Sequence, residues 1–176
     1  MIRAFLGVPL PQSVKKELGK EIKKLTTALS DWNVNWVKPE NLHVTLIFFG
    51  SIPEEGVEAL QGEIEPTLTG VGPFKVKTGA LFASQRPVWL EIDKGGDKLA
   101  ELQKRLADNL SLKGVEESRP FHPHLTLGRV KKRGRAKPPK ASKNFSWKAD
   151  RAVLYESKLD SSGSTYKELF SFTLSQ

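Results

Sequence analysis

The sequence contains no cysteine and a single methionine in 176 residues, and only three of its residues are histidines. Without cysteine, disulfide bonds and zinc–thiolate sites are excluded. No apolar run approaches the roughly 18 residues that a membrane-spanning helix requires, and the apolar N-terminal segment is too short for a secretory signal. These absences favour a soluble cytoplasmic protein without a membrane partner, for which a monomer is the default expectation.

Acidic residues are in deficit, because 20 Asp and Glu are set against 28 Lys and Arg and the formal net charge is +8. A basic excess favours anionic partners, either nucleic acid or a phosphate group. The hydrophobic fraction of 38% and the aromatic fraction of 9% support a packed core. At this length we expect one domain over residues 1–176, built as two lobes that share a core.

Two of the three histidines lie in a repeated motif of the form His-x-Thr-Leu. Residues 43–46 are His-Val-Thr-Leu and residues 124–127 are His-Leu-Thr-Leu, each within an apolar run typical of a strand. Residues two apart in a strand point to the same face. Each copy therefore presents an imidazole beside a hydroxyl, and the repetition favours two half-sites that face each other across a cleft.

Paired imidazoles and hydroxyls suit acid–base chemistry on a phosphoryl group. Because imidazole titrates near neutral pH, one ring can act as a base while the other acts as an acid. Hydroxyl groups, together with an arginine, can stabilise the charge on the phosphoryl oxygens. The sequence has no carboxylate cluster or His-x₃-His pair of the metal-binding type, so we expect neither a metal nor a cofactor.

The rest of the chain predicts an α+β fold with two antiparallel or mixed sheets and helices on their outer faces. Apolar residues at three- and four-residue spacing indicate helices, and alternating or continuous short apolar runs indicate strands. The repeated motif suggests that the two halves are pseudo-symmetric. The expected strands are 2–8, 42–49, 74–82, 88–92, 124–130, 147–158 and 166–174, and the expected helices are 11–29, 53–68 and 97–109.

The two motifs and their flanks resemble a known family. Residues 36–50, WVKPENLHVTLIFFG, are similar to the first motif region of the RNA 2′,3′-cyclic phosphodiesterases, also called 2′-5′ RNA ligases, of the two-histidine phosphoesterase superfamily. Residues 119–129, RPFHPHLTLGR, resemble the second motif region. Residues 3–11 and 162–169 also fit, so the likeness extends nearly from end to end.

The resemblance implies a bilobal fold with a central cleft and the opening of a terminal RNA 2′,3′-cyclic phosphate to a 2′-phosphate. It implies that His43 and His124 form the acid–base pair and that Thr45 and Thr126 bind the phosphate. We assign His43 as the acid and His124 as the base, although the sequence does not fix this order. Arg129 is a further candidate for binding the phosphate.

Strand alternation makes the placement of two neighbours conditional. Arg129 has the opposite parity to His124, so it reaches the cleft only if the strand bulges or ends first. The same alternation places Phe49 on the His43 face and Phe48 in the core. Phe48, Phe49 and Phe121 are the candidate stacking surfaces for the terminal base.

Charged residues near the motifs provide further candidates. The basic loop 131–140, with Arg119 and Arg129, is able to form a rim for the RNA backbone, although a solvated loop is an equally good interpretation. Glu40 and Glu117 are candidates to orient an imidazole. His122 is interpreted as a loop side chain.

Three functions remain open at this point. The leading hypothesis is metal-independent hydrolysis of the cyclic phosphate. The second is ligation of RNA halves through a 2′-5′ bond in the same site. The third is a nucleotide- or RNA-binding module that lacks catalysis.

Overall fold

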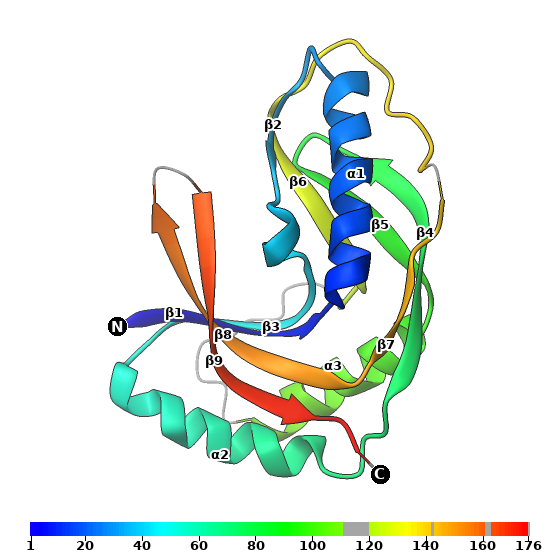
Figure 1. The fold of residues 1–176 in the computed structure, drawn as a ribbon. Helices are drawn as coiled ribbons and strands as arrows, with labels where there is room; N and C mark the ends of the chain where they lie inside the picture. Colours follow the sequence, from blue (N-terminus) through cyan, green and yellow to red (C-terminus); the bar gives the residue numbers. More distant parts are fainter. Residues whose placement is uncertain (111–119, 142, 161–162, 176) are drawn as a thin grey trace.

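The computed structural model describes residues 1–110, 120–141, 143–160 and 163–175, which form two β-sheets flanked by helices (Figure 1). The helices are α1 (Gln12–Ala28), α2 (Val57–Leu68) and α3 (Gly96–Asn109), with short 3₁₀ turns at Pro39–Asn41 and Glu54–Gly56. The strands are β1 (Ile2–Pro9), β2 (Asn33–Trp36), β3 (His43–Ile52), β4 (Phe74–Ala83), β5 (Pro87–Lys94), β6 (His124–Lys132), β7 (Ser146–Ala149), β8 (Arg151–Asp160) and β9 (Gly163–Thr173).

The strands form two sheets in which each hydrogen-bonded pair of strands is antiparallel. Sheet A has the order β3-β1-β8-β9, and sheet B has the order β2-β6-β5-β4-β7. One histidine motif opens β3 of sheet A and the other opens β6 of sheet B, and these two strands are in contact where the sheets meet. The predicted α+β fold with two sheets is therefore confirmed.

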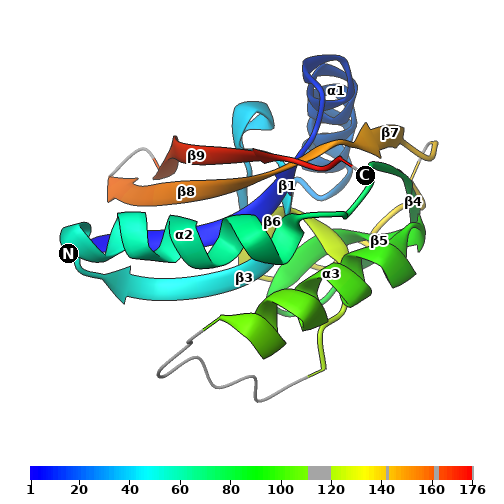
Figure 2. The same cartoon turned by 90° about the horizontal axis from the view of Figure 1, so that it is seen from below.

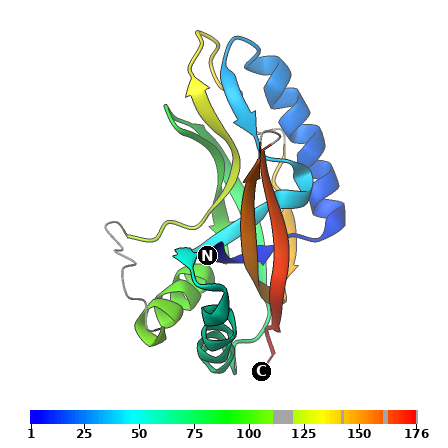
Figure 3. The ribbon, with the colours of Figure 1, turned by 90° about the vertical axis from the view of Figure 1, so that its left-hand side faces the viewer.

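The helices pack against the sheets through the apolar positions that the sequence spacing indicates. Leu18, Ile22 and Leu25 of α1 are buried, as are Leu99 and Leu106 of α3. Helix α3 contacts both β3 and β5, so it bridges the two sheets, while α2 packs beside α3 and reaches β9 (Figure 2). Helix α1 runs alongside sheet B (Figure 3). Within the described residues, no helix is long and apolar enough to cross a bilayer.

One predicted strand was wrong, because the run 147–158 is divided between the two sheets. Strand β7 pairs with β4 in sheet B, and after Asp150 the chain enters β8, which pairs with β1 in sheet A. The carbonyl of Asp150 accepts a hydrogen bond from the Leu174 N–H at 2.8 Å. The apolar pattern continues through Asp150 because the residues on both sides are buried, so the sequence gives no sign of the change of sheet.

Candidate active site

The first motif holds the His43 ring by hydrogen bonds at both nitrogens. Nδ1 lies 2.7 Å from the carbonyl oxygen of Asn41, and Nε2 lies 2.9 Å from Oγ1 of Thr45. A carbonyl only accepts, so Nδ1 carries the proton. In the neutral ring Nε2 therefore accepts a hydrogen bond from the Thr45 hydroxyl. Gly7 of the adjacent β1 makes room for the ring, since a Cβ there would lie 3.1 Å from His43 Cδ2.

The second motif holds His124 in the same way. Its Nδ1 lies 2.7 Å from the carbonyl oxygen of His122, again two residues earlier in the chain. This bond fixes the proton on Nδ1 and leaves Nε2 of the neutral ring as an acceptor. In the part of the chain that the structure describes, Thr126 Oγ1 makes no hydrogen bond, which is a difference from Thr45. The sequence placed both imidazoles in strands but gave no sign that main-chain carbonyls orient them.

Both motif strands contain a bulge at the leucine of His-x-Thr-Leu. In β3, Thr45 pairs with Gly7 and Ile47 pairs with Leu6, so Leu46 is the extra residue. In β6, Thr126 pairs with Trp89 and Gly128 pairs with Val88, so Leu127 is the extra residue. The first nine residues of the two strands follow the same order of buried, half-buried and exposed positions. The pseudo-symmetry of the motifs therefore extends to their backbone irregularity.

The bulges decide which side chains share the face of the histidines, because an extra residue reverses the alternation beyond it. Phe48 pairs with Phe5 on the His43 face, is 60% exposed, and has its ring 5.9 Å from that of Phe5. Phe49 packs against the core instead. The prediction that Phe49 faces the site was therefore wrong, since it assumed an unbroken alternation.

Arg129 meets the condition that the sequence set for reaching the cleft. Beyond the bulge it pairs with Pro87, which is two residues from Trp89, the partner of Thr126. Arg129 therefore lies on the face of Thr126 and His124, and its side chain is exposed. It occupies the position in β6 that Phe48 occupies in β3, five residues after the histidine. The two half-sites thus pair an aromatic ring with a guanidinium.

The environments of the two imidazoles differ in burial. The His43 ring lies against three aromatic rings, with centroid distances of 4.7 Å to Phe5, 5.4 Å to Tyr166 and 6.1 Å to Tyr155. Burial lowers the pKa of His43 to about 4, and the charges of Lys15 and His124 act in the same direction against the Asn41 hydrogen bond. At neutral pH His43 is therefore an uncharged ring in the unliganded protein.

The low pKa of His43 makes the stability of the fold dependent on pH. Between about pH 6.5 and pH 4 the unfolded chain binds a proton at His43 that the folded chain excludes, so the free energy of unfolding decreases as the pH falls. We expect this group to contribute about 2 kcal/mol, less than the full shift because the ring is half-buried. Urea unfolding at pH 7 and pH 4.5, compared with His43→Asn, measures it. Equal losses in the two proteins would contradict the assignment.

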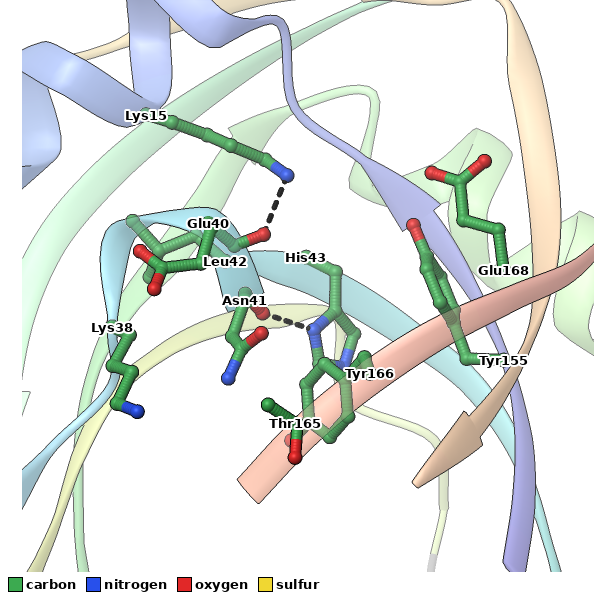
Figure 4. Close-up of a pocket in the computed structure, with 10 residues that line it drawn as sticks. All are labelled: Lys15, Lys38, Glu40, Asn41, Leu42, His43, Tyr155, Thr165, Tyr166 and Glu168. Carbon is green, nitrogen blue, oxygen red and sulfur yellow. Dashed lines mark hydrogen bonds between the residues drawn. The ribbon is translucent and has the colours of Figure 1, made fainter. Parts of the chain in front are cut away.

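Two pockets border the first half-site. One, of about 180 Å³, is lined by Lys15, Glu40, His43 and Tyr166 among others, and Figure 4 shows the Lys15 ammonium directed at the Glu40 carbonyl oxygen, 2.7 Å away. The other, of about 80 Å³, is lined by Arg129 from sheet B. The residues that line both pockets, and so make them neighbours, are Lys38, Asn41 and Tyr166. His124 and Thr126 line neither pocket.

Several sequence expectations about neighbouring residues have a definite outcome. Glu40 does not orient His43, because the Asn41 carbonyl does so. Arg119 and Glu117 lie outside the described residues. His122 is an exposed loop side chain as predicted, with Nε2 3.8 Å from Glu91, but its carbonyl has the orienting role at His124. Tyr166 was missed as a neighbour of His43, although the segment that contains it was part of the family resemblance.

Two antiparallel sheets that each present a His-x-Thr strand define the two-histidine phosphoesterase class. A model of the 2′-5′ RNA ligase superfamily matches residues 13–160. An RNA 2′,3′-cyclic phosphodiesterase of Methanothermobacter thermautotrophicus is 33% identical over 135 residues, covering 74% of this chain and 72% of that protein. The one from Bacillus subtilis is 31% identical over 180 residues, covering 97% and 96%.

A solved structure shows the same fold. Escherichia coli LigT complexed with 3′-AMP superposes with a TM-score of 0.83 at 24% identity, covering 99% of both chains. The chain therefore belongs to the 2′-5′ RNA ligase superfamily. The family resemblance stated from the two motifs is confirmed.

Proposed function

We propose that the protein hydrolyses the terminal 2′,3′-cyclic phosphate of RNA to a 2′-phosphate, with His43 and His124 as the acid–base pair. The observation that carries this proposal is the equivalence of the two motif strands, each of which fixes Nδ1 on a carbonyl and leaves Nε2 available. The printed names of the relatives, RNA 2′,3′-cyclic phosphodiesterases, support the same reaction.

In the proposed reaction, His124 takes a proton from water as its oxygen attacks phosphorus. The bond from phosphorus to the 3′-oxygen breaks, and His43 donates a proton to that oxygen, which leaves a 2′-phosphate and a 3′-hydroxyl. His43 is neutral in the unliganded protein, so it must gain its proton when the anionic phosphate binds beside it. An adjacent negative charge raises an imidazole pKa and favours this proton uptake.

The hydroxyls and the guanidinium have the complementary task of holding the phosphoryl oxygens. Thr126 Oγ1 has no hydrogen-bond partner among the described residues, and Thr45 Oγ1 is bound only to His43 Nε2. Arg129 supplies a permanent positive charge and a fork of donors on the same face. All of these side chains come from one chain, so the proposed reaction requires no second subunit.

Phe48 is proposed as a stacking surface for the ribose or base of the terminal nucleotide. Its ring is exposed on the His43 face, and stacking on an aromatic ring contributes roughly 1–3 kcal/mol per base. We expect Phe48→Ala to raise the KM for a cyclic-phosphate dinucleotide about tenfold with little change in kcat. Phe82→Ala, which removes another exposed aromatic ring, is the matched control. An unchanged KM in Phe48→Ala would contradict the stacking role.

The test of the proposed function is the product formed from an oligonucleotide with a 2′,3′-cyclic phosphate end. In a buffer containing EDTA we expect turnover to a 2′-phosphate, identified by ³¹P NMR and by a mass gain of one water. A second reaction that also contains a 5′-hydroxyl strand tests the ligation alternative that the superfamily's name suggests. A 3′-phosphate product, a requirement for metal, or binding without turnover would contradict the proposal.

A further inference from the structure

The excess positive charge of the protein is concentrated in one short segment. Residues 129–140, here called the basic track, contain seven of the 28 Lys and Arg residues and no acid. The other 164 residues therefore carry 21 basic and 20 acidic side chains, which nearly cancel. The track, and not the surface as a whole, is what gives this chain its affinity for anions.

The basic track leads directly away from the candidate active site. It begins at Arg129, on the His124 face of β6, and continues past the end of that strand into the loop at the far end of sheet B (Figure 1). Eight residues separate His124 from Lys132, which is about 26 Å along a strand. This span suits several nucleotides of a single strand, since such grooves hold roughly 4–16 nucleotides.

The loop of the track is held in place by the segment between α1 and β2. The carboxylate of Asp31 accepts hydrogen bonds from the main-chain N–H groups of Arg135 and Ala136. The indole N–H of the buried Trp32 donates to the Ala136 carbonyl at 3.1 Å, and the Arg133 guanidinium lies 5.1 Å from the Trp32 ring. The charges are therefore presented from a fixed backbone, which lowers the cost of ordering on binding.

The charges of the track are not neutralised by the protein itself. Within the described parts of the chain, no Lys or Arg of residues 129–140 forms an ion pair. Lysines elsewhere do so, including Lys20 with Glu17, and Lys98 with Glu101. Asp31 lies beside the loop, but its carboxylate binds main-chain N–H groups. Cations without protein partners, arranged along a line, match the repeating phosphates of a nucleic acid strand.

We propose that the basic track binds the backbone of the RNA on the 5′ side of the reacting end, so that RNA strands are preferred over short cyclic nucleotides. This inference rests on the proposed function. The contacts are to phosphates, because the track offers lysine and arginine side chains and no aromatic ring for stacking, and they carry no sequence preference. The partner is a single strand several nucleotides long.

The test compares a cyclic-phosphate dinucleotide with a 12-nucleotide strand that ends in the same dinucleotide. For the wild type we expect kcat/KM to be at least tenfold higher for the long strand at low salt, and the advantage to disappear at high salt. The triple variant Lys131→Gln, Lys132→Gln and Arg135→Gln should lose this advantage and keep its rate on the dinucleotide within twofold. Its salt dependence should fall by about 0.7 log units per lost contact.

The matched control removes three exposed lysines away from the track, by Lys98→Gln, Lys104→Gln and Lys148→Gln. It has the same net charge as the track variant and should keep the long-strand advantage. Equal rates on both substrates in the wild type, or equal losses in the two triple variants, would overturn the role of the track while the proposed function stands. Absence of turnover on both substrates would overturn the proposed function instead.

Discussion

His124→Ala is expected to lower kcat on a cyclic-phosphate substrate by roughly 10²- to 10⁴-fold, and His43→Gln by a similar factor, because each removes one proton-transfer step. Substrate binding should change much less, since the threonines and Arg129 remain. Single-turnover kinetics measure the chemical step, and circular dichroism checks the fold. Glutamine is chosen at position 43 because the ring packs among Phe5 and Tyr166, where alanine would leave a cavity.

A substrate with sulfur in place of the 3′-oxygen separates the roles of the two histidines. A thiolate leaves without protonation, so the variant that lacks the acid should recover most of its rate on this substrate. We expect recovery in His43→Gln and none in His124→Ala. The opposite pattern would reverse the order of acid and base, and near-wild-type turnover of either variant on the natural substrate would refute the assignment of the pair.

Arg129→Ala should lower kcat/KM by about 10²- to 10³-fold, which is the usual cost of removing one donor that stabilises charge in the transition state. Its guanidinium lies on the His124 face only because of the bulge at Leu127. Arg129→Lys keeps the charge but loses the fork of donors, and we expect it to recover only part of the activity. Inhibition by inorganic phosphate, measured beside the kinetics, reports directly on anion binding.

Arg133→Ala is the control for Arg129→Ala, because Arg133 belongs to the same basic track but lies against Trp32 at its far end. It should leave the rate on a dinucleotide unchanged. If the two alanine variants lost equal activity on the dinucleotide, the effect of Arg129 would be one of general charge. A rate in Arg129→Ala equal to that of the wild type would remove this residue from the proposed site.

Strand periodicity predicted the motif positions correctly and failed just beyond them. His43 and Thr45 share one face as the alternation requires, because no irregularity separates them. Phe48 and Phe49 were exchanged, since the extra residue at Leu46 shifts everything that follows. An apolar residue such as Leu46 is buried in either register, so its identity does not reveal the bulge.

The sequence alone determined the paired His-x-Thr motifs, most of the helices and strands, the two-sheet α+β class and the concentration of charge after the second motif. These follow from local periodicity and composition. The tertiary structure decided the burial that lowers the pKa of His43, the division of one run between two sheets, and the faces occupied by Phe48 and Arg129. Each of these depends on the register between strands distant in the chain, which the order of residues within one strand does not specify.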